Sequence, residues 1–432
     1  MERRTFVKGL AAGVMAAGAL PACAEPGNGR LQGLVEDLGK AADDAAFWKR
    51  VRQEFLLSPG LVHFNSGSTG ASPRVVVEAV CSFLREMEAD PQNNVWGGLG
   101  AGTEEVRARA AAFIGADLAE TAITRNTSEG MSVVASGLQL KAGDEVLTTN
   151  HEHGGGMVCW QYLAKHAGVK IRYLEMPVPP ESKDQILQLV SDHITERTRV
   201  CSFSHVETIL GTVMPMAEIA AITRPRDILL VCDGAQVPGM LEVDVKALQV
   251  DTYASSSHKW LLAPKGSGIL YVRREVQERV QPLWLAEGFA TYNAAVGTRD
   301  VHNILGHGVA IDFHNAITRP RVEARCRQLN RLARELLARI PALRLLSAQD
   351  PALTSGMVTY AVDPGKGSNG EILGRLYKEH RIQVKAAQPT YAYVPDMASR
   401  QTNYNAVRIS THIFNSEEEV AQLAEKLGAM LA

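Results

Sequence analysis

Two residues, Asp233 and Lys259, combine a reactive side chain with a position where a folded chain could use it. Asp233 directly follows the apolar run 228–232, and Lys259 lies in a polar turn between the strand-like runs 252–255 and 266–272. An acid at the carboxyl end of a buried parallel strand lies where open α/β sheets bind ligands. A Lys embedded in such a turn can have a lowered pKa and act as a nucleophile. Taken singly, Asp233 could instead cap a helix and Lys259 could be a solvated surface residue.

A third feature is segment 126–130, in which Thr127 and Ser128 open a helical stretch. A helix N-terminus with small hydroxyl side chains binds a phosphate group well, although the same residues also suit a plain N-cap. A Lys for covalent attachment, an acid for a pyridine nitrogen and a phosphate cup together indicate pyridoxal 5'-phosphate as the cofactor. His151 and His153 could form a metal pair, but no third ligand follows at a suitable spacing, so we predict no metal site.

Further segments carry a resemblance to a known family, and they follow one another in the family's order: 63–70, 152–161, 204–211 and 297–300. The sequence resembles the class V aminotransferase family of fold-type I pyridoxal-phosphate enzymes over about residues 64–415. That family includes cysteine desulfurases, selenocysteine lyases and isopenicillin N epimerases, and segment 63–70 is most similar to the epimerase-like branch. Each single match could be ordinary packing, but the shared order makes chance a poor explanation for the set.

The resemblance implies cofactor roles for the matching residues. It implies that Lys259 binds the cofactor covalently, that His153 stacks on the pyridine ring and that Asp233 pairs with the pyridine nitrogen. These three are the predicted catalytic residues. Ala235 is expected to pack under the ring and Gln236 to bond the phenolic oxygen. The remaining expected cofactor ligands are Thr127, Ser128, Thr208, Ser256, His258 and Thr298.

The resemblance also implies a partner and a substrate group. Thr298 matches a residue that reaches the phosphate of a neighbouring subunit, which implies a homodimer with shared active sites. Arg408 matches the Arg that holds a substrate α-carboxylate, a task that suits a bidentate guanidinium, and Asn65 is expected on the substrate side. Thr208 stands where the family has an Asn that contacts the cofactor, so this chain departs from the family there.

The residue pattern predicts the elements that position this site. Between 61 and 315, strand-like runs at 145–149, 169–174, 199–203 and 228–232 alternate with stretches long enough for crossover helices. This alternation is typical of a mostly parallel sheet with helices on both faces. From 316 to 432 the pattern changes to that of a smaller α+β domain. The predicted fold class is therefore α/β: a fold-type I PLP-dependent transferase whose large domain is followed by a smaller C-terminal α+β domain.

Composition limits the classes of partner. The 432 residues are 46% hydrophobic and 21% charged, which is typical of an ordinary globular protein and argues against disorder. The formal net charge of −2 provides no electrostatic attraction to nucleic acid or to an anionic membrane. No stretch reaches the roughly 18 apolar residues of a membrane span.

The N-terminus resembles an export signal. Arg3 and Arg4 precede an uncharged run from 9 to 24, so we predict a twin-arginine signal peptide over 1–24. An ordinary signal or a buried helix are the alternatives, and residues 20–23 loosely resemble a lipoprotein cleavage box. The twin-arginine translocase exports folded proteins, which suits a protein that captures a cytoplasmic cofactor, so we expect a periplasmic location. Residues 25–60 are predicted to form an N-terminal arm with one short helix.

The sequence constrains the reaction less than the cofactor. Cysteine desulfurases need a nucleophilic Cys on a loop before the Arg strand, but segment 381–389 has no Cys and none follows Cys326, which argues against desulfuration. Transamination of an amino-acid unit, epimerisation at its α-carbon and β-elimination from a sulfur amino acid stay open. A binding protein without activity is the alternative from another class, and the presence of Lys259, Asp233 and Arg408 together argues against it.

Export also bears on the substrate. Primary amino-acid metabolism is cytoplasmic, so an exported member fits better as an enzyme that tailors a secreted peptide product. By similarity to exported relatives, the favoured substrate is the glutamyl unit of a peptide siderophore. Lys385, Gln388, Tyr391 and Tyr393 are candidates for the substrate entrance, although the two Tyr residues also suit an alternating strand face.

Overall fold

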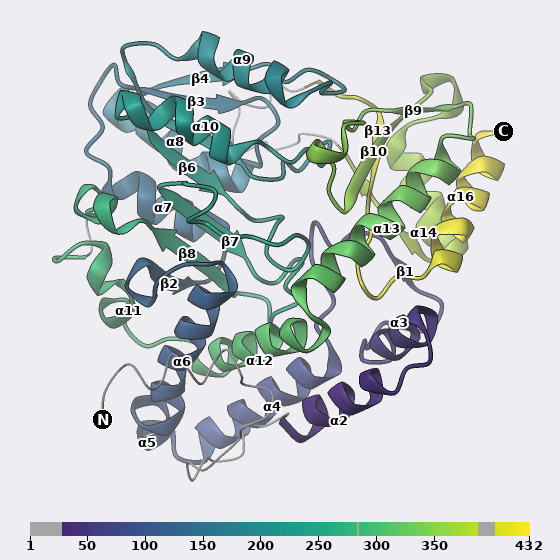
Figure 1. Ribbon diagram of the computed structural model, residues 1–432, viewed down its shortest axis with the longest axis horizontal. Coiled ribbons are helices and arrows are strands. Elements are labelled where there is room, and N and C mark those ends of the chain that lie inside the picture. The colour runs from purple at the N-terminus through teal and green to yellow at the C-terminus, as the bar shows by residue number, and fades with distance from the viewer. Residues whose placement is uncertain (1–27, 283–284, 388–401) are drawn as a thin grey trace.

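The computed structural model describes residues 28–282, 285–387 and 402–432. The predicted signal peptide over 1–24 lies outside the described residues, as do Gln388, Tyr391 and Tyr393. Figure 1 shows a large α/β part and a smaller C-terminal part beside it. The predicted fold class, with its mostly parallel sheet, is confirmed.

The large part is built on a seven-stranded sheet with the order β2-β8-β7-β6-β5-β3-β4. Its strands are β2 (Thr121–Thr124), β3 (Glu145–Thr149), β4 (Lys170–Leu174), β5 (Thr198–Ser204), β6 (Leu229–Asp233), β7 (Thr252–Ser256) and β8 (Gly268–Val272). Strand β8 runs antiparallel to β2 and β7, and the other pairings are parallel. The four strands predicted from apolar runs form as β3 to β6, with bounds that differ by at most one residue.

Both faces of the central sheet are covered, which explains why most of its strands are buried along almost their whole length. Leu229 and Val231 of β6 lie in one core, with helices α7 (Thr127–Gly137), α8 (Gly154–Ala167) and α11 (Tyr292–Ala295). Leu230 and Cys232 lie in the opposite core. The helices of that second face are α4 (Arg74–Ala89), α6 (Gly98–Phe113), α9 (Lys183–His193), α10 (Met216–Thr223) and α12 (Val301–Ile317).

The C-terminal part has its own sheet and core. An antiparallel sheet with the order β12-β13-β10-β9 contains β9 (Leu343–Leu345), β10 (Met357–Val362), β12 (Lys385–Ala386) and β13 (Ala406–Ser410). Helices α13 (Arg319–Leu337), α14 (Asn369–His380) and α16 (Glu417–Leu431) pack on it (Figure 1). A capping box of Ser416 and Glu419 begins α16, because each side chain accepts an N–H at the other residue.

The N-terminal segment contains two helices rather than the single short helix that we predicted. These are α2 (Asn28–Gly39) and α3 (Asp44–Arg52), which lie near α4 in Figure 1; α5 (Pro91–Trp96) follows α4. Buried Phe47, Trp48 and Val51 of α3 join the core that includes α4 and α12. Strand β1 (Val62–His63) then pairs in parallel with β11 (Ile382–Gln383), so the segment also contacts the C-terminal part.

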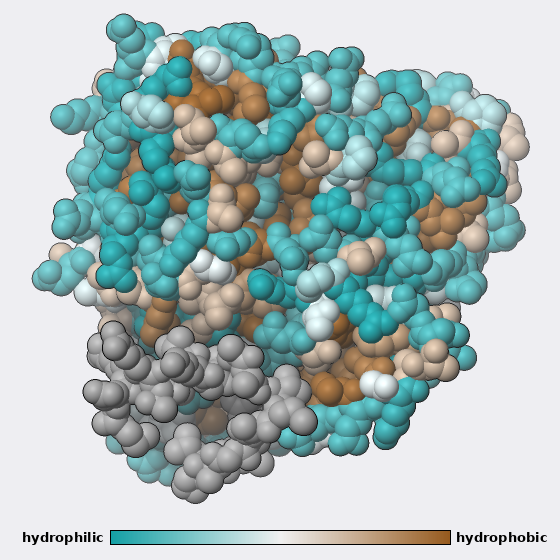
Figure 2. Space-filling view, viewed as in Figure 1, coloured by the Kyte–Doolittle hydropathy of each residue, from teal (hydrophilic) through white to brown (hydrophobic). Residues whose placement is uncertain are grey.

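The helices and one face of the surface were compared with what a membrane-spanning or strongly apolar protein would show. None of the helices in the described part of the chain is long and apolar enough to cross a bilayer. The face shown in Figure 2 is mostly hydrophilic, with scattered apolar areas between polar side chains.

Candidate active site

A cavity of about 390 Å³ lies between the carboxyl ends of the central strands and the β12–β13 pair. Most of the predicted site residues line it: Thr127, Ser128, His153, Thr208, Asp233, Ala235, Ser256, His258, Lys259 and Arg408. These residues come from segments that are far apart in the sequence. The fold therefore brings the predicted cofactor residues and the predicted substrate Arg to one place.

Asp233 and Lys259 provide the acid and the amine of this cavity. Asp233 is the last residue of β6, is buried, and its Oδ1 accepts the N–H of Ala235 at 2.9 Å. Lys259 follows β7, and its backbone N–H donates to the Ser256 carbonyl at 3.3 Å. Burial lowers the pKa of Lys259 to about 8, although the Asp233 carboxylate opposes this change. Burial raises the pKa of Asp233. The chain thus holds an amine that loses its proton near neutrality beside a buried acid.

The N-terminus of α7 forms the anion-binding end of the cavity. The Thr127 N–H donates to Ser256 Oγ at 3.0 Å, and the two hydroxyl oxygens lie 2.8 Å apart. The Nδ1 atom of His258 is buried without a hydrogen-bond partner in the described part of the chain. Hydroxyl groups, an unpaired imidazole nitrogen and a helix N-terminus are groups that suit a phosphate. These residues therefore fit the phosphate group of pyridoxal phosphate.

Two successive glycines, Gly155 and Gly156, let the N-terminus of α8 approach the cavity closely. His153 is the N-cap of α8, and its Nδ1 accepts the N–H of Gly155 at 3.0 Å. A Cβ atom on Gly155 would lie 2.5 Å from Ser128 Oγ, and one on Gly156 would lie 2.7 Å from Asp233 Oδ2. Burial lowers the pKa of His153 to about 3, so its ring is neutral and suits stacking. The glycine run is a sequence signal for this close approach that the predictions above did not include.

Arg408 of β13 donates hydrogen bonds to oxygen atoms of the loops beside it. It is only 3% exposed, and its Nη1 donates to the carbonyl oxygen and to the Oγ1 of Thr208, both at 2.7 Å. Its Nη2 donates to Asn65 Oδ1 at 3.3 Å and to Ser68 Oγ at 3.4 Å. Thr208, which replaces the family's Asn, therefore positions the predicted substrate Arg in this structure. Asn65 contacts Arg408 and is not among the residues that line the cavity.

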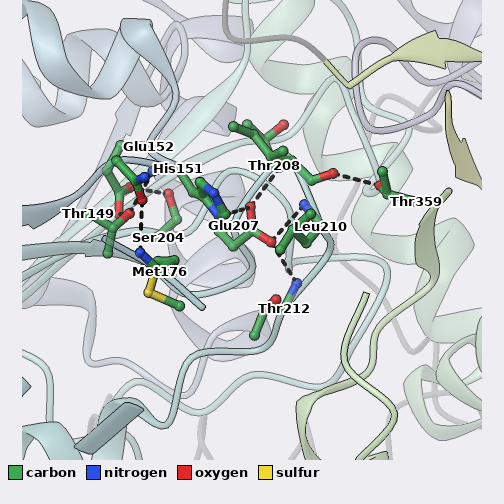
Figure 3. Close-up of polar contacts among 12 residues, drawn as sticks. Thr149, His151, Glu152, Met176, Ser204, Glu207, Thr208, Leu210, Thr212 and Thr359 are labelled. Atoms are coloured by element: carbon green, nitrogen blue, oxygen red, sulfur yellow. Dashed lines mark hydrogen bonds and ion pairs between the residues drawn. The ribbon is translucent and has the colours of Figure 1, made fainter. Parts of the chain in front are cut away.

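Glu207 organises the loop that carries Thr208. Its buried carboxylate accepts the N–H groups of Ile209 and Leu210 at 2.7 Å and that of Thr212 at 3.2 Å (Figure 3). Burial raises the pKa of Glu207, while these N–H groups favour its charged form. Glu207 is not among the residues predicted from the sequence, and its place in segment 204–211 is the signal that could have pointed to it.

The carbonyl groups of the same loop, residues 208–211, face the C-terminal part. Arg408 donates to the Thr208 carbonyl, and Thr359 Oγ1 of β10 donates to the Ile209 carbonyl at 2.6 Å. Ser347 Oγ donates to the Leu210 carbonyl at 2.5 Å, and Ser355 Oγ to the Gly211 carbonyl at 2.7 Å. We call residues 208–211 with these four donors the clasp. It joins the large part to the sheet that carries Arg408.

A second polar group lies beside Glu207 in Figure 3. Glu152 accepts hydrogen bonds from Ser204 Oγ at 2.5 Å and from Thr149 Oγ1 at 2.7 Å, and burial raises its pKa to about 8. His151 Nε2 lies 3.1 Å from the Tyr404 hydroxyl rather than in the cavity. Among the described residues, no group of three His, Cys, Asp or Glu side chains is placed to hold a metal ion.

Two predicted cofactor ligands lie outside the cavity, while a predicted entrance residue lines it. The Gln236 side chain lies behind the cavity, where Nε2 donates to the Gly67 carbonyl at 3.0 Å and Oε1 accepts from Trp260 Nε1 at 2.7 Å. Its bond to the phenolic oxygen stays a prediction. Thr298 is exposed and lies outside the cavity; its contact with a neighbouring subunit also stays a prediction. Lys385, a candidate for the substrate entrance, lines the cavity.

A doubly covered parallel sheet with a Lys, an acid and a phosphate cup at its strand ends defines the fold-type I class of pyridoxal-phosphate enzymes. Residues 62–423 match the family model of the class V aminotransferases, and the chain belongs to this family. The chain is 32% identical to the isopenicillin N epimerase of Streptomyces clavuligerus, over 89% of this chain and 98% of that one.

Other similar proteins are named cysteine desulfurases rather than epimerases. A probable cysteine desulfurase of Pyrococcus abyssi is 27% identical, with 86% of this chain and 94% of that one covered. The apo structure of a cysteine desulfurase from Thermococcus onnurineus NA1 superposes with a TM-score of 0.76 at 25% identity, covering 89% of this chain and 98% of that chain. Family membership and the fit of the cavity agree on pyridoxal 5'-phosphate as the cofactor.

Proposed function

We propose that this protein acts on the α-carbon of an amino acid or amino-acid unit by a reaction of the transamination type. The observation that carries this proposal is the presence of Lys259, with a pKa of about 8, and the carboxylate-binding Arg408 in one cavity. Pyridoxal phosphate, when bound, supplies the electron withdrawal that acidifies the α-carbon proton. An amine whose pKa lies close to physiological pH is a suitable base for that proton.

The residues of the chain divide this task. Arg408 binds the substrate α-carboxylate and so orients the α-carbon toward Lys259, which takes the proton and returns it at a second position. Asp233 stabilises positive charge at the pyridine nitrogen, and neutral His153 covers the ring. Thr127, with its neighbours at the N-terminus of α7, binds the phosphate. Transamination needs only one base that both removes and returns the proton, and Lys259 can serve as that base.

Epimerisation at the α-carbon is the second candidate, because the Streptomyces clavuligerus relative at 32% identity is named isopenicillin N epimerase. Elimination from a sulfur amino acid also uses the same first proton transfer. Sulfur transfer to a Cys is not supported: no Cys lines the cavity within the described residues, and none follows Cys326 in the sequence.

The location and assembly belong to the same proposal. We infer that the twin-arginine translocase exports the folded protein to the periplasm, where it tailors a secreted peptide such as a siderophore at its glutamyl unit. Arg3, Arg4 and the uncharged run after them support this route. We also infer a homodimer, in which Thr298 reaches the neighbouring phosphate. Cell fractionation of the Arg3→Lys, Arg4→Lys double variant tests export, because loss of the paired Arg residues should keep the protein in the cytoplasm.

The reaction is tested on the purified holoenzyme in heavy water with a panel of L-amino acids and a glutamyl-headed peptide. Transamination predicts conversion of the cofactor to pyridoxamine phosphate together with a 2-oxo product. An unchanged cofactor with deuterium at an inverted α-carbon would instead indicate epimerisation, and pyruvate release would indicate a lyase. An absorption spectrum that no amine changes would contradict all three reactions.

A further inference from the structure

The turn that carries Lys259 contains a residue in an unfavourable backbone conformation. Leu262 has a φ of 58°, in the left-handed region that bulky side chains rarely adopt. Trp260, Leu261 and Leu262 are all fully buried. Backbone strain of this kind persists only where surrounding contacts hold the chain in place. The contacts of Trp260, the residue directly after Lys259, therefore bear on where the amine of Lys259 lies.

His412 of the C-terminal part contacts the backbone of Trp260. Its Nε2 donates to the Trp260 carbonyl oxygen at 2.8 Å, and its Nδ1 accepts the N–H of Ile413 at 2.7 Å. A neutral imidazole has one donor and one acceptor nitrogen, so these two backbone groups fix the tautomer. Burial lowers the pKa of His412 to about 4, which keeps the ring neutral at physiological pH. Both ring nitrogens of His412 thus bind backbone groups, one of them directly after Lys259.

The His412 ring also lies against the indole of Trp260. The two ring centroids are 5.3 Å apart and the ring planes are inclined by 28°. The indole Nε1–H in turn donates to Gln236 Oε1 at 2.7 Å, and Gln236 Nε2 donates to the carbonyl of Gly67, which lines the cavity. His412 and Trp260 are fully buried, so their contacts are shielded from solvent. His412 therefore restrains both the carbonyl group and the ring of Trp260.

His412 reaches the turn of Lys259 from the segment that carries Arg408. It follows Ser410, the last residue of β13, by two positions. Neither His412 nor Trp260 is among the residues that line the cavity, so an effect of His412 on the amine passes through Trp260. This contact is separate from the clasp at residues 208–211. The large part and the C-terminal part are therefore also joined directly beside Lys259.

We propose that His412 is a positioning residue that holds Lys259 where its amine can reach the cofactor and the substrate α-carbon. The hydrogen bond to the Trp260 carbonyl is the main restraint, because it fixes the backbone directly after Lys259, and the ring contact adds packing. The inference rests on the proposed function, since it takes Lys259 as the group that binds the cofactor and moves the proton. Because His412 comes from the segment after Arg408, its contact places the amine relative to that guanidinium.

The test measures how fast Lys259 binds pyridoxal phosphate covalently in the full-length protein. Cofactor-free protein, prepared with hydroxylamine, is mixed with excess pyridoxal phosphate. The Lys259 amine attacks the aldehyde carbon, a C=N bond forms and water leaves. Borohydride then reduces that bond by hydride transfer, and mass spectrometry measures the labelled fraction of Lys259. Calorimetry with pyridoxine phosphate, which lacks the aldehyde, measures the phosphate and ring contacts alone.

Two variants separate the hydrogen bond from the ring. His412→Phe keeps a flat ring and removes the donor, so the attachment rate should fall at least about 10-fold, because the buried Trp260 carbonyl is left unpaired. His412→Gln keeps an N–H donor and should stay within about 3-fold of the wild-type rate. The affinity for pyridoxine phosphate should be unchanged in both variants. His166→Phe is the matched control, since His166 also lies against an aromatic ring, that of Tyr162, but is exposed on α8.

Several results would overturn the inference. Attachment at the wild-type rate in His412→Phe would show that the Trp260 carbonyl needs no donor from His412. Equal losses in His412→Phe and His412→Gln, or a parallel loss of affinity for pyridoxine phosphate, would show a general packing role. If His412→Phe does not fold, His412→Met replaces it as the donor-free variant under the same criteria. Attachment is measured without an amine substrate, so a failure of the proposed reaction leaves this test intact, whereas a wild-type protein that never labels Lys259 contradicts both.

Discussion

The two walls of the cavity are built in different ways. The cofactor wall consists of strand ends and helix starts of one sheet: Asp233 ends β6, Lys259 follows β7, and Thr127 begins α7. The opposite wall, which we propose for the substrate and call the substrate wall, carries Arg408 and Lys385 on a separate sheet. That sheet is joined to the cofactor wall through the clasp.

The residues of the two walls are held in place by different interactions. The positions on the cofactor wall follow from strand order and backbone pairing, so many hydrogen bonds must break before one residue moves. The position of Arg408 depends on a few side-chain donors that contact the carbonyls of residues 208–211. Changes on the cofactor wall should therefore affect chemistry, while changes at the clasp should affect substrate affinity and stability.

The largest effect is expected for Lys259→Ala on the cofactor wall. In the proposed function Lys259 is the base and the point of covalent attachment, so turnover of the variant should fall by at least about 10³-fold. The phosphate-binding groups at α7 remain, so the cofactor should still bind but become removable by dialysis. Absorption spectra before and after dialysis, with turnover assays, check this. Retention of more than a tenth of wild-type turnover would exclude Lys259 as the base, and Lys378→Ala is the control.

Arg408→Lys should affect substrate binding but not cofactor binding, because Arg408 lies on the substrate wall. A Lys at this position loses the forked donors that bind a carboxylate, so KM should rise about 10- to 100-fold. The absorption spectrum of the bound cofactor should stay unchanged. Steady-state kinetics and spectra of the same preparation test both statements, with Arg344→Lys at an exposed position of β9 as control. A changed spectrum with unchanged KM would reverse the assignment of the two walls.

Thr359→Val should weaken the clasp. The Ile209 carbonyl would lose its donor inside the protein, which should lower the free energy of unfolding by about 1–3 kcal/mol. KM should rise several-fold because Arg408 is then less firmly placed, while the cofactor spectrum stays the same. Denaturant unfolding and steady-state kinetics measure the two effects. Thr359→Ser keeps the hydroxyl group and should retain wild-type KM; equal KM values in both variants would show that the clasp does not position Arg408.

The smallest effect concerns Glu152, whose pKa is raised from 4.5 to about 8 by burial. The folded state then holds a proton that the unfolded state releases between these pH values. The stabilisation is therefore complete below about pH 4.5 and is lost as the pH rises through about 8. Glu152→Gln removes this titration. The melting temperature of the wild type should fall more than that of the variant between pH 5 and pH 8, by on the order of a few °C. If the melting temperatures of the wild type and of Glu152→Gln changed equally between pH 5 and pH 8, the raised pKa of Glu152 would be contradicted.

Local sequence patterns predicted much of the cofactor wall. The run 228–232 forms β6 with Asp233 at its end, and segment 126–130 begins α7, because these features depend on near neighbours in the chain. The N-terminal segment was harder: α2 and α3 are two helices where one was predicted. Their formation depends on packing against distant residues, since Phe47 and Trp48 are buried in the core shared with α4 and α12.

The sequence alone determined the class of the site. Lys259, Asp233 and the hydroxyl residues of α7 have the side-chain chemistry that pyridoxal phosphate requires, and the alternation of apolar runs predicts a sheet that can hold them. Only the tertiary structure decided the substrate wall. Strand register placed Lys385 opposite Arg408, and the clasp tied Thr208 to Arg408, which is 200 residues away in the chain. The physical reason is that local periodicity fixes which residues form a strand, whereas pairing between distant strands is fixed by packing of the whole chain.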